Sequence, residues 1–272
     1  MRISLVTPSY NQAQFIARTI DSVLAQRGDF ELEYRVIDGG STDGTLDILA
    51  GYGDRLSWAS ERDRGQVDAI NRGLRGASGD IVGWLNSDDV LMPGALARVA
   101  AAFRANRDAE WLHGRCMIID ADDREVRRWI SAYKHYRSRH HTLSRFLTEN
   151  YVSQMTVFWR RGALEAVGYL DPEIRYAFDY DLFLRLAERG APIYVEEPLA
   201  CFRWYETSKS GAGFVVQMTE TAEIASRSPA ASSLTRVQAL AKKTAIINIY
   251  RALGLARGAI SLARPSSRSS RS

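Results

Sequence analysis

The sequence predicts an α/β protein in which a mainly parallel sheet is flanked by helices and followed by a helical C-terminal tail. Short apolar runs alternate along the chain with segments whose apolar residues recur every three or four positions. Polar clusters around Thr7, Asp38 and Asp88 each follow such a run, and parallel sheets bind ligands beyond the carboxyl ends of their strands. With 272 residues and 46% hydrophobic content, the chain can form one sizeable core.

The two patterns predict the elements in chain order. Strands are expected over 2–7, 32–38, 56–59, 81–85, 111–120, 125–130, 155–159 and 192–202. Helices are expected over 15–24, around 46–49, and over 68–74, 91–103, 179–189 and 214–263. Ser41 or Thr42 is expected to cap the second helix, and Asp181 is expected to pair with Arg185 four residues later.

The chain is expected to divide into a catalytic domain over 1–213, a helical extension over 214–264 and a disordered Ser/Arg-rich tail over 265–272. From residue 216 onward the chain contains nine Lys/Arg and only two Glu, so this part has a net charge of +7. The remainder of the chain has a net charge of −3, which gives the total of +4. Leu234, Val237 and Ala241 form one stripe at helical spacing. Such a helix can lie on an anionic membrane, pack on the catalytic domain or join a homodimer, and the sequence leaves these alternatives open.

Composition excludes several classes of protein. The two cysteines, Cys116 and Cys201, lie in apolar surroundings and read as buried small side chains. The four histidines show no zinc-site spacing. No apolar run is long enough to span a bilayer, and the N-terminus begins directly in a strand without a signal peptide, so a cytoplasmic protein is expected. Nucleic-acid binding is not expected, because only the basic tail favours it.

The most informative segment is Trp84-Leu85-Asn86-Ser87-Asp88-Asp89, where a buried strand ends in adjacent carboxylates. Carboxylates at such a place are costly unless they bind a cation or other polar partners. Oxygen ligands suit Mg²⁺ or Mn²⁺, which usually complete their coordination with water and substrate phosphates. The segment therefore predicts a metal-bound phosphorylated substrate at the end of a strand.

The other clusters favour binding of a nucleoside, and they do not form a Gly-rich phosphate-binding loop. Neither a G-x-G-x-x-G after the first strand nor a P-loop motif is present. The segment Thr7-Pro8-Ser9-Tyr10-Asn11 offers hydroxyls and an aromatic ring instead. Asp38, followed by Gly39-Gly40, can accept a hydrogen bond from a base N–H, and the charged run over 60–71 is expected to contribute to binding.

Five motifs in order resemble family 2 glycosyltransferases, and the similarity covers roughly residues 2–210. The motifs are Thr7-Pro8-Ser9-Tyr10-Asn11, Asp38-Gly39-Gly40-Ser41-Thr42-Asp43-Gly44-Thr45, Asp63-Arg64-Gly65 with Asp68-Ala69-Ile70-Asn71-Arg72-Gly73, Trp84-Leu85-Asn86-Ser87-Asp88-Asp89, and Phe178-Asp179-Tyr180-Asp181-Leu182. The resemblance implies the Rossmann-like GT-A fold, a nucleotide-diphosphate sugar donor, most simply a UDP-sugar, and Mn²⁺ or Mg²⁺ as cofactor.

The resemblance also implies residue roles. Asn86-Ser87-Asp88 stands where the family has its D-x-D, so Asp88 becomes the principal metal ligand, Asp89 assists it, and Asn86 is a neutral contact. Asp179 takes the place of the general base, although Phe178 replaces the preceding Glu of the family pattern. The remaining residues implied for donor binding are Thr7, Pro8, Tyr10, Asp38, Arg64, Asp68, Ser87, Arg203, Ser208 and Lys209.

The implied reaction is an inverting sugar transfer to a hydroxyl of a glycan or lipid-linked glycan, as in cell-surface polysaccharide synthesis. A nucleotidyltransferase would need a Gly-rich basic signature after the first strand, which Pro8-Ser9-Tyr10-Asn11 is not. A non-catalytic binding module is disfavoured because Asp88 and Asp179 are both present. The acceptor region, expected over 133–154, has no readable code for the sugar, the acceptor or the linkage.

Overall fold

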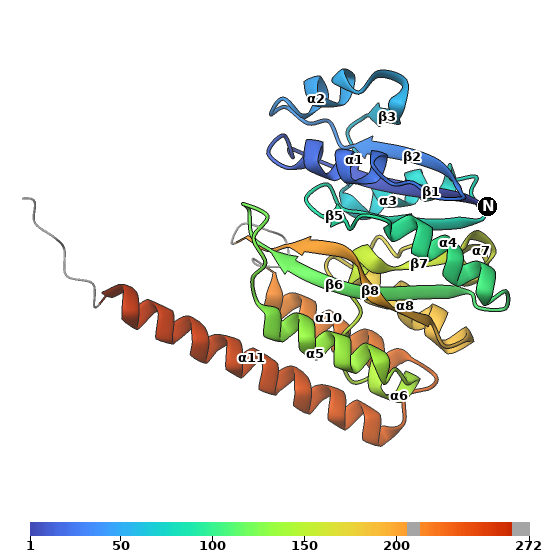
Figure 1. Ribbon diagram of the computed structural model, residues 1–272. Helices are drawn as coiled ribbons and strands as arrows, with labels where there is room; N and C mark the ends of the chain where they lie inside the picture. The colour runs from blue at the N-terminus through green and yellow to red at the C-terminus, as the bar shows by residue number, and fades with distance from the viewer. Residues whose placement is uncertain (206–212, 263–272) are drawn as a thin grey trace, which may run out of the picture.

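The computed structural model describes residues 1–205 and 213–262, so Ser208, Lys209 and the 265–272 tail lie outside the described residues. The described strands form one sheet in the order β3-β2-β1-β4-β7-β6-β8-β5, in which β5 and β7 run antiparallel to the others (Figure 1). The strands are β1 (Arg2–Ser9), β2 (Glu31–Asp38), β3 (Ser57–Ser60), β4 (Ile81–Trp84), β5 (Val90–Leu91), β6 (Trp111–Ile119), β7 (Phe158–Arg160) and β8 (Ile193–Arg203).

Helices cover both faces of this sheet. They are α1 (Ile16–Leu24), α2 (Thr45–Gly51), α3 (Gln66–Arg75), α4 (Ala95–Ala105), α5 (Arg128–Arg139), α6 (Leu143–Phe146), α7 (Arg161–Val167), α8 (Phe178–Arg189), α10 (Phe214–Arg227) and α11 (Ser233–Leu262), with short 3₁₀ turns η1 (Gly53–Arg55) and η2 (Gln154–Thr156). This arrangement confirms the predicted mainly parallel α/β sheet with a helical C-terminal extension.

Alternation along the strands divides the apolar core into two clusters. In β1, Ile3 and Leu5 belong to the cluster beneath α1, α2 and α4, whereas Val6 points to the cluster beneath α3, α7 and α8. Three buried tryptophans, Trp84, Trp111 and Trp159, fill the second cluster. Each face of the sheet is therefore covered by helices, as an apolar parallel sheet requires.

The structure corrects the strand expected over 125–130. Asp123 and Arg127 both adopt positive φ, at 66° and 53°, and turn the chain away from the sheet. The pairing that remains is an isolated bridge between Ile119 and Glu125, after which α5 begins at Arg128. The acceptor region expected over 133–154 thus contains most of α5 and all of α6.

Two helix starts also differ from the expectation. The helix expected from 91 begins at Ala95, because Val90–Leu91 forms β5 and pairs with β8. Neither Ser41 nor Thr42 caps α2, which begins after Gly44 at a φ of 93°. The expected pair of Asp181 with Arg185 is confirmed, with a bond from Arg185 Nη2 to Asp181 Oδ2 of 2.8 Å.

The C-terminal extension packs against the rest of the described chain. α11 contacts α10, and Lys242 Nζ on α11 donates to Glu149 Oε2 at 3.1 Å. Of the alternatives for this segment, packing on the catalytic part is therefore realised over the first half of α11. Among the described residues, none of the helices combines the length and hydropathy needed to cross a membrane.

Candidate active site

A cavity of about 1390 Å³ opens at the carboxyl ends of β1, β2 and β4. The register of the sheet places Ser9 beside Asp38 and Val6 beside Trp84, so the loops that follow these strands meet at one edge. The lining residues from these loops include Pro8, Tyr10, Gly39, Gly40, Asn86, Ser87 and Asp88. The three polar clusters singled out in the sequence are thus brought together.

Asp38 lies beneath the cavity and is completely buried. Its Oδ2 accepts from the amides of Gly40 and Ser41 at 2.9 Å each and from Ser60 Oγ at 2.7 Å, and its Oδ1 accepts from Ser41 Oγ at 2.5 Å. The carboxylate therefore orders the Gly39-Gly40 loop that lines the cavity, and in this arrangement it has no exposed surface for the base contact expected from the sequence.

Thr7 is likewise buried, and its hydroxyl bonds to Tyr34 Oη at 3.0 Å. The neighbouring Pro8 and the exposed Tyr10 reach the cavity instead. Thr7 and Asp38 are thus supports of the cavity wall.

Arg64 and Asp68 do not line the cavity. Their side chains pair with each other at 3.3 Å, and the Arg64 side chain is 89% exposed. The same segment reaches the cavity through Arg62, Asp63, Gly65 and Gln66, of which Gln66 opens α3.

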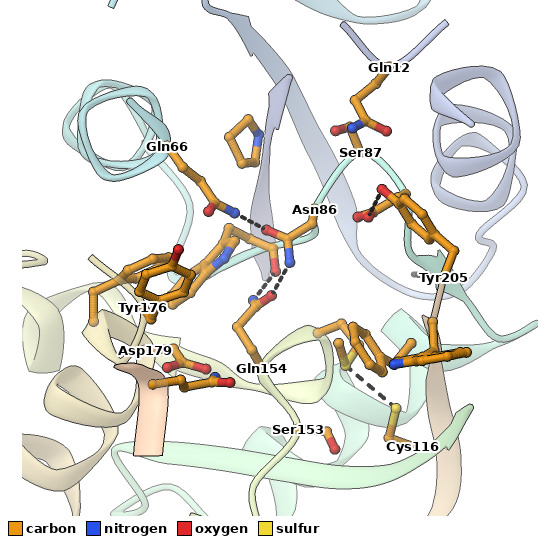
Figure 2. A pocket seen from close by; sticks show the side chains of 18 of the residues that line it. Gln12, Gln66, Asn86, Ser87, Cys116, Ser153, Gln154, Tyr176, Asp179 and Tyr205 are labelled. Carbon is orange, nitrogen blue, oxygen red and sulfur yellow. Dashed lines mark hydrogen bonds between the residues drawn. The ribbon is translucent and has the colours of Figure 1, made fainter. Parts of the chain in front are cut away.

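A chain of side-chain amides forms the cavity floor. Gln66 Nε2 donates to Asn86 Oδ1 at 2.9 Å, Asn86 Nδ2 donates to Gln154 Oε1 at 3.1 Å, and Gln154 Nε2 donates to the Trp84 carbonyl at 2.8 Å. Figure 2 shows Asn86 between the two glutamines. The network links α3, the end of β4 and η2, so the position of Asn86 is set from two sides.

The two adjacent carboxylates have different surroundings. Asp88 lines the cavity and its Oδ2 accepts from Tyr205 Oη at 2.9 Å (Figure 2). Asp89 is completely buried, with Oδ1 accepting from the Arg203 amide at 2.9 Å and Oδ2 from Asn86 Nδ2 at 3.3 Å. Asp89 thus supports the loop from below and has no surface in the cavity for a metal ion.

Burial governs the ionisation of this pair. Burial raises the pKa of the Asp88 carboxyl, against the hydrogen bond from Tyr205. Burial, and then the adjacent charge of Asp88, raise the pKa of Asp89 well above its usual range, against the bonds from Arg203 and Asn86. A cation bound in the cavity would stabilise the charged forms of these two buried carboxylates.

Arg203 lies under the loop rather than in the cavity. Its side chain is fully buried, with Nε donating to the Asp88 carbonyl at 2.8 Å and Nη1 to the Asp120 carbonyl at 2.7 Å. The guanidinium also pairs with Asp123 at 2.5 Å and lies 4.8 Å from the Phe15 ring centroid. The expected diphosphate contact is therefore not supported, and Arg203 instead fixes the backbone of Asp88.

The oxygens around Asp88 fit a hard divalent cation completed by substrate. Across residues 1–205 and 213–262, no three His, Cys, Asp or Glu side chains converge as a metal site. Asp88, with Asn86 and Ser87 beside it, offers one carboxylate and neutral oxygens to the cavity. Mg²⁺ and Mn²⁺ bind such incomplete oxygen sets together with phosphates, whereas Zn²⁺ prefers three or four nitrogen and sulfur ligands.

Asp179 stands on another wall of the same cavity. It lies in the first turn of α8, and its Oδ1 accepts from the Tyr180 amide at 2.7 Å. The turn before it is held by Glu220 on α10, whose Oε2 accepts from the amides of Tyr176 and Ala177 at 2.7 and 2.9 Å. Figure 2 shows Asp179 beside Tyr176 and Gln154, across the cavity from Gln12. Asp88 and Asp179 therefore face one space.

The sequence did not indicate the cavity residues that come from α5 and its surroundings. Lys134 lines the cavity and its Nζ donates to Ser153 Oγ at 3.3 Å. Burial lowers the pKa of its ammonium, while the nearby charges of Asp179 and Glu149 act in the opposite direction. Trp129 and Trp204 also line this half, as does Gln154. Because the residues over 125–130 favour a strand, no sequence signal places α5 here.

Comparison with known proteins identifies relatives of this chain. Residues 4–168 match the model of the family described as "Glycosyl transferase family 2". The "PGL/p-HBAD biosynthesis glycosyltransferase" of Mycobacterium tuberculosis is 32% identical over 188 residues, which are 67% of this chain and 68% of that protein. An uncharacterized glycosyltransferase of Rickettsia typhi is 23% identical over 264 residues, covering 91% and 82% of the two chains.

Two solved structures share the fold. Staphylococcus aureus TarS 1–349 in complex with UDP-GlcNAc superposes with a TM-score of 0.66 at 22% identity, covering 90% of this chain and 72% of that one. The longer TarS chain is covered over only 43% of its length. Mannosyltransferase PcManGT of Pyrobaculum calidifontis, in complex with GDP-Man and Mn²⁺, gives a TM-score of 0.63 at 19% identity, covering 93% and 80%. Both likenesses support the GT-A architecture predicted from the sequence.

Proposed function

The chain belongs to glycosyl transferase family 2, and we propose that it is an inverting glycosyltransferase. We propose that its donor is a nucleotide-diphosphate sugar, with a UDP-sugar as the first candidate. The acceptor in this proposal is a hydroxyl of a glycan or lipid-linked glycan in cell-surface polysaccharide synthesis. The observation that carries it is the single cavity lined by both Asp88 and Asp179. The UDP-GlcNAc named for TarS supports the choice of nucleotide. A cytoplasmic location stays a prediction.

The donor occupies the half of the cavity formed by the loops after β1 and β2 and the start of α3. Tyr10 at the rim offers an aromatic face to the base, and the ordered Gly39-Gly40 backbone allows close approach of the ribose. Arg62 and Gln66 supply donors toward the phosphates. The donor half of the cavity is held in shape by residues that do not touch the nucleotide, namely Thr7, Asp38, Arg64 and Asp68.

Asp88, with Asn86 and Ser87 beside it, would hold Mn²⁺ or Mg²⁺ against the diphosphate, and such an ion supplies charge neutralisation to the leaving group. The Mn²⁺ named for PcManGT supports this choice of cofactor. Arg203 contributes by holding the Asp88 backbone, and Asp89 contributes by holding the backbone of Arg203 and the amide of Asn86.

Asp179 acts as the general base in this proposal. The acceptor oxygen attacks the anomeric carbon on the face opposite the diphosphate, and the bond from that carbon to the diphosphate oxygen breaks. The electron pair leaves with the diphosphate, and the proton of the acceptor hydroxyl passes to the Asp179 carboxylate. One displacement of this kind inverts the anomeric configuration.

The experiment is a binding and turnover screen with UDP-, GDP- and dTDP-sugars and Mn²⁺. We expect one nucleotide class to raise the melting temperature, and EDTA to abolish donor turnover. Asp88→Asn should lower turnover by about 10²–10³-fold, the cost of removing one stabiliser of the developing charge. Asp122→Asn, in the exposed turn before α5, is the matched control and should leave turnover unchanged. Full turnover in EDTA would contradict the metal assignment, and no response to any sugar nucleotide would contradict the function.

A further inference from the structure

The helix α5 presents a row of aromatic rings to solvent. Trp129, Tyr133 and Tyr136 follow one another at the i, i+4 and i+7 positions, with exposed fractions of 70%, 46% and 61%. Large aromatic side chains rarely stay exposed in a row unless the surface binds something. Trp129 also lines the catalytic cavity, so this row begins at the cavity mouth.

The first half of α11 continues this surface. Leu234, Val237 and Leu240 are each more than half exposed, whereas Thr235 and Ala239 face inward and are buried. Glu149 joins the two helices, because its Oε2 accepts from Tyr133 Oη on α5 at 2.8 Å and from Lys242 Nζ on α11 at 3.1 Å. Figure 1 shows α5, α6, α10 and α11 gathered on one side of the sheet, away from α1, α2 and β3. We call the exposed side of α5 and α11 the aromatic–basic face.

The charge of the chain is concentrated in the same two segments. Neither α5 nor α11 contains an acidic residue. Residues 124–145 contain seven Lys/Arg and one Glu, a net +6, and α11 contains five Lys/Arg and no acidic residue, a net +5. Because the whole chain carries +4, the remainder carries −7. Glu149 pairs with Arg137 and Lys242, and Glu196 pairs with Arg139, but these two acids leave the aromatic–basic face with a net positive charge on an otherwise negative protein.

We propose that the aromatic–basic face docks on an anionic membrane surface and opens the catalytic cavity toward it, so that the acceptor is a lipid-anchored hydroxyl compound. Tyr and Trp are favoured at the membrane interface because they present an apolar body and a polar edge. A basic helix with an apolar stripe lies in the plane of such an interface. The acceptor class rests on the proposed glycosyltransferase function, whereas the docking does not.

Charge decides between this occupant and two others. A symmetric dimer through this face would bring the same positive surface of two copies together, which repels. A nucleic acid would satisfy the charge but would leave Leu234, Val237 and Leu240 without apolar partners. Anionic lipid headgroups with acyl chains beneath them satisfy both the charge and the apolar side chains.

The first test measures binding of the full chain to vesicles of phosphatidylcholine, alone or mixed with phosphatidylglycerol. We expect binding to the mixed vesicles that weakens with salt. Each basic residue near such a surface contributes about fivefold to partitioning, so Tyr136→Ser combined with Arg236→Glu should lower it by more than about tenfold. The matched control is Trp58→Ser with Arg107→Glu, which removes an exposed tryptophan on β3 and an exposed arginine after α4 and should leave partitioning unchanged.

The second test asks whether the cavity mouth meets the lipid. Vesicles with brominated acyl chains should quench tryptophan fluorescence of the wild-type chain, and Trp129→Phe should lose a distinct part of that quenching. Equal quenching in both proteins would overturn the proposed orientation of the cavity.

Three outcomes would overturn the docking itself. They are equal binding to neutral and anionic vesicles, a dimer in light scattering that Leu234→Ser disrupts, and RNA binding that depends on Tyr136 and Arg236. Donor binding in vesicle-free solution is measured alongside on the Tyr136→Ser/Arg236→Glu protein. In that variant, retained sugar-nucleotide binding shows that only the docking is lost. In the wild-type chain, sugar-nucleotide binding without vesicle binding refutes the docking alone, and vesicle binding without sugar-nucleotide binding refutes the proposed function alone.

Discussion

We expect Arg203→Met to destabilise the protein strongly. Donor binding should weaken only because the fold is less stable, and not because a contact with the donor is lost. The guanidinium is fully buried and donates to the carbonyls of Asp88 and Asp120, besides its pair with Asp123. Methionine preserves much of the apolar stem but leaves these acceptors without a donor. Breaking a buried charged network of this kind costs about 3–5 kcal/mol, and we expect a loss of that size in the free energy of unfolding.

Urea denaturation measures this loss, and an exposed ion pair supplies the control. Arg189 binds Glu110 through two bonds of 2.7 and 2.6 Å, yet its side chain is 43% exposed. Arg189→Met should therefore cost less than about 1 kcal/mol, because water screens the pair and replaces its bonds. The contrast between the two variants tests burial rather than the mere loss of an arginine.

The competing expectation is a direct bond from Arg203 to the diphosphate. Under that expectation, Arg203→Met would keep the urea midpoint while donor affinity falls. A variant with unchanged stability and lost sugar-nucleotide binding would therefore refute our assignment of Arg203 as a support of the Asp88 loop. A large loss of stability in Arg203→Met, with a small one in Arg189→Met, would uphold it.

Three further predictions follow from the same contacts. Asp179→Asn should lower kcat by about 10²–10⁴-fold, while calorimetry finds the same affinity for the donor; near-normal turnover would remove Asp179 as the base. Tyr205→Phe deletes the hydroxyl bonded to Asp88 Oδ2, so Mn²⁺ titration should give tighter binding, and weaker binding would make the phenol itself a ligand. Burial works to raise the pKa of Glu33, but hydrogen bonds from Ser4, Ser78 and Arg35 lower it from 4.5 to about 2. The stability this carboxylate contributes is present above pH 4.5 and is lost as the pH falls toward 2, so Glu33→Gln should flatten the acid limb of the unfolding curve, whereas an unaltered limb would contradict the assignment.

The sequence was sufficient where one local pattern decides the structure. The strand at 2–7 carries the buried Ile3, Leu5 and Val6 and lies inside the sheet between β2 and β4, so no other element competes for it. The same holds for α8, where Leu182, Phe183 and Leu186 form one inward face. The motifs that follow the strands also converge as predicted, because neighbouring parallel strands deliver their loops to one edge.

Local sequence patterns did not predict the structure where a distant strand partner or a positive φ angle determines it. The run over 125–130 has strand-forming residues, but positive φ at Asp123 and Arg127 turns it into the start of α5. Val90–Leu91 pairs with β8, a strand more than a hundred residues later, which no local pattern can reveal. For the same reason the burial of Arg203 could not be foreseen, since its partners lie in the loops after β4 and β6.

The asparagine in the D-x-D position follows from what surrounds it. Asn86 donates to Asp89 and to Gln154 while it accepts from Gln66, and an amide supplies two N–H donors together with an acceptor oxygen, whereas an ionised carboxylate can only accept. An aspartate at this position would face the buried Asp89 as a second anion, and the pKa of Asp89 is already raised well above its usual range by burial and by Asp88. The amide therefore removes a charge that the loop could not neutralise. It also leaves Asp88 as the anionic ligand, which Asn86 and Asp89 position from beneath. The two positions that are acidic in the family motif therefore have different roles here: Asp88 is a carboxylate in the cavity, and Asn86 is a structural amide.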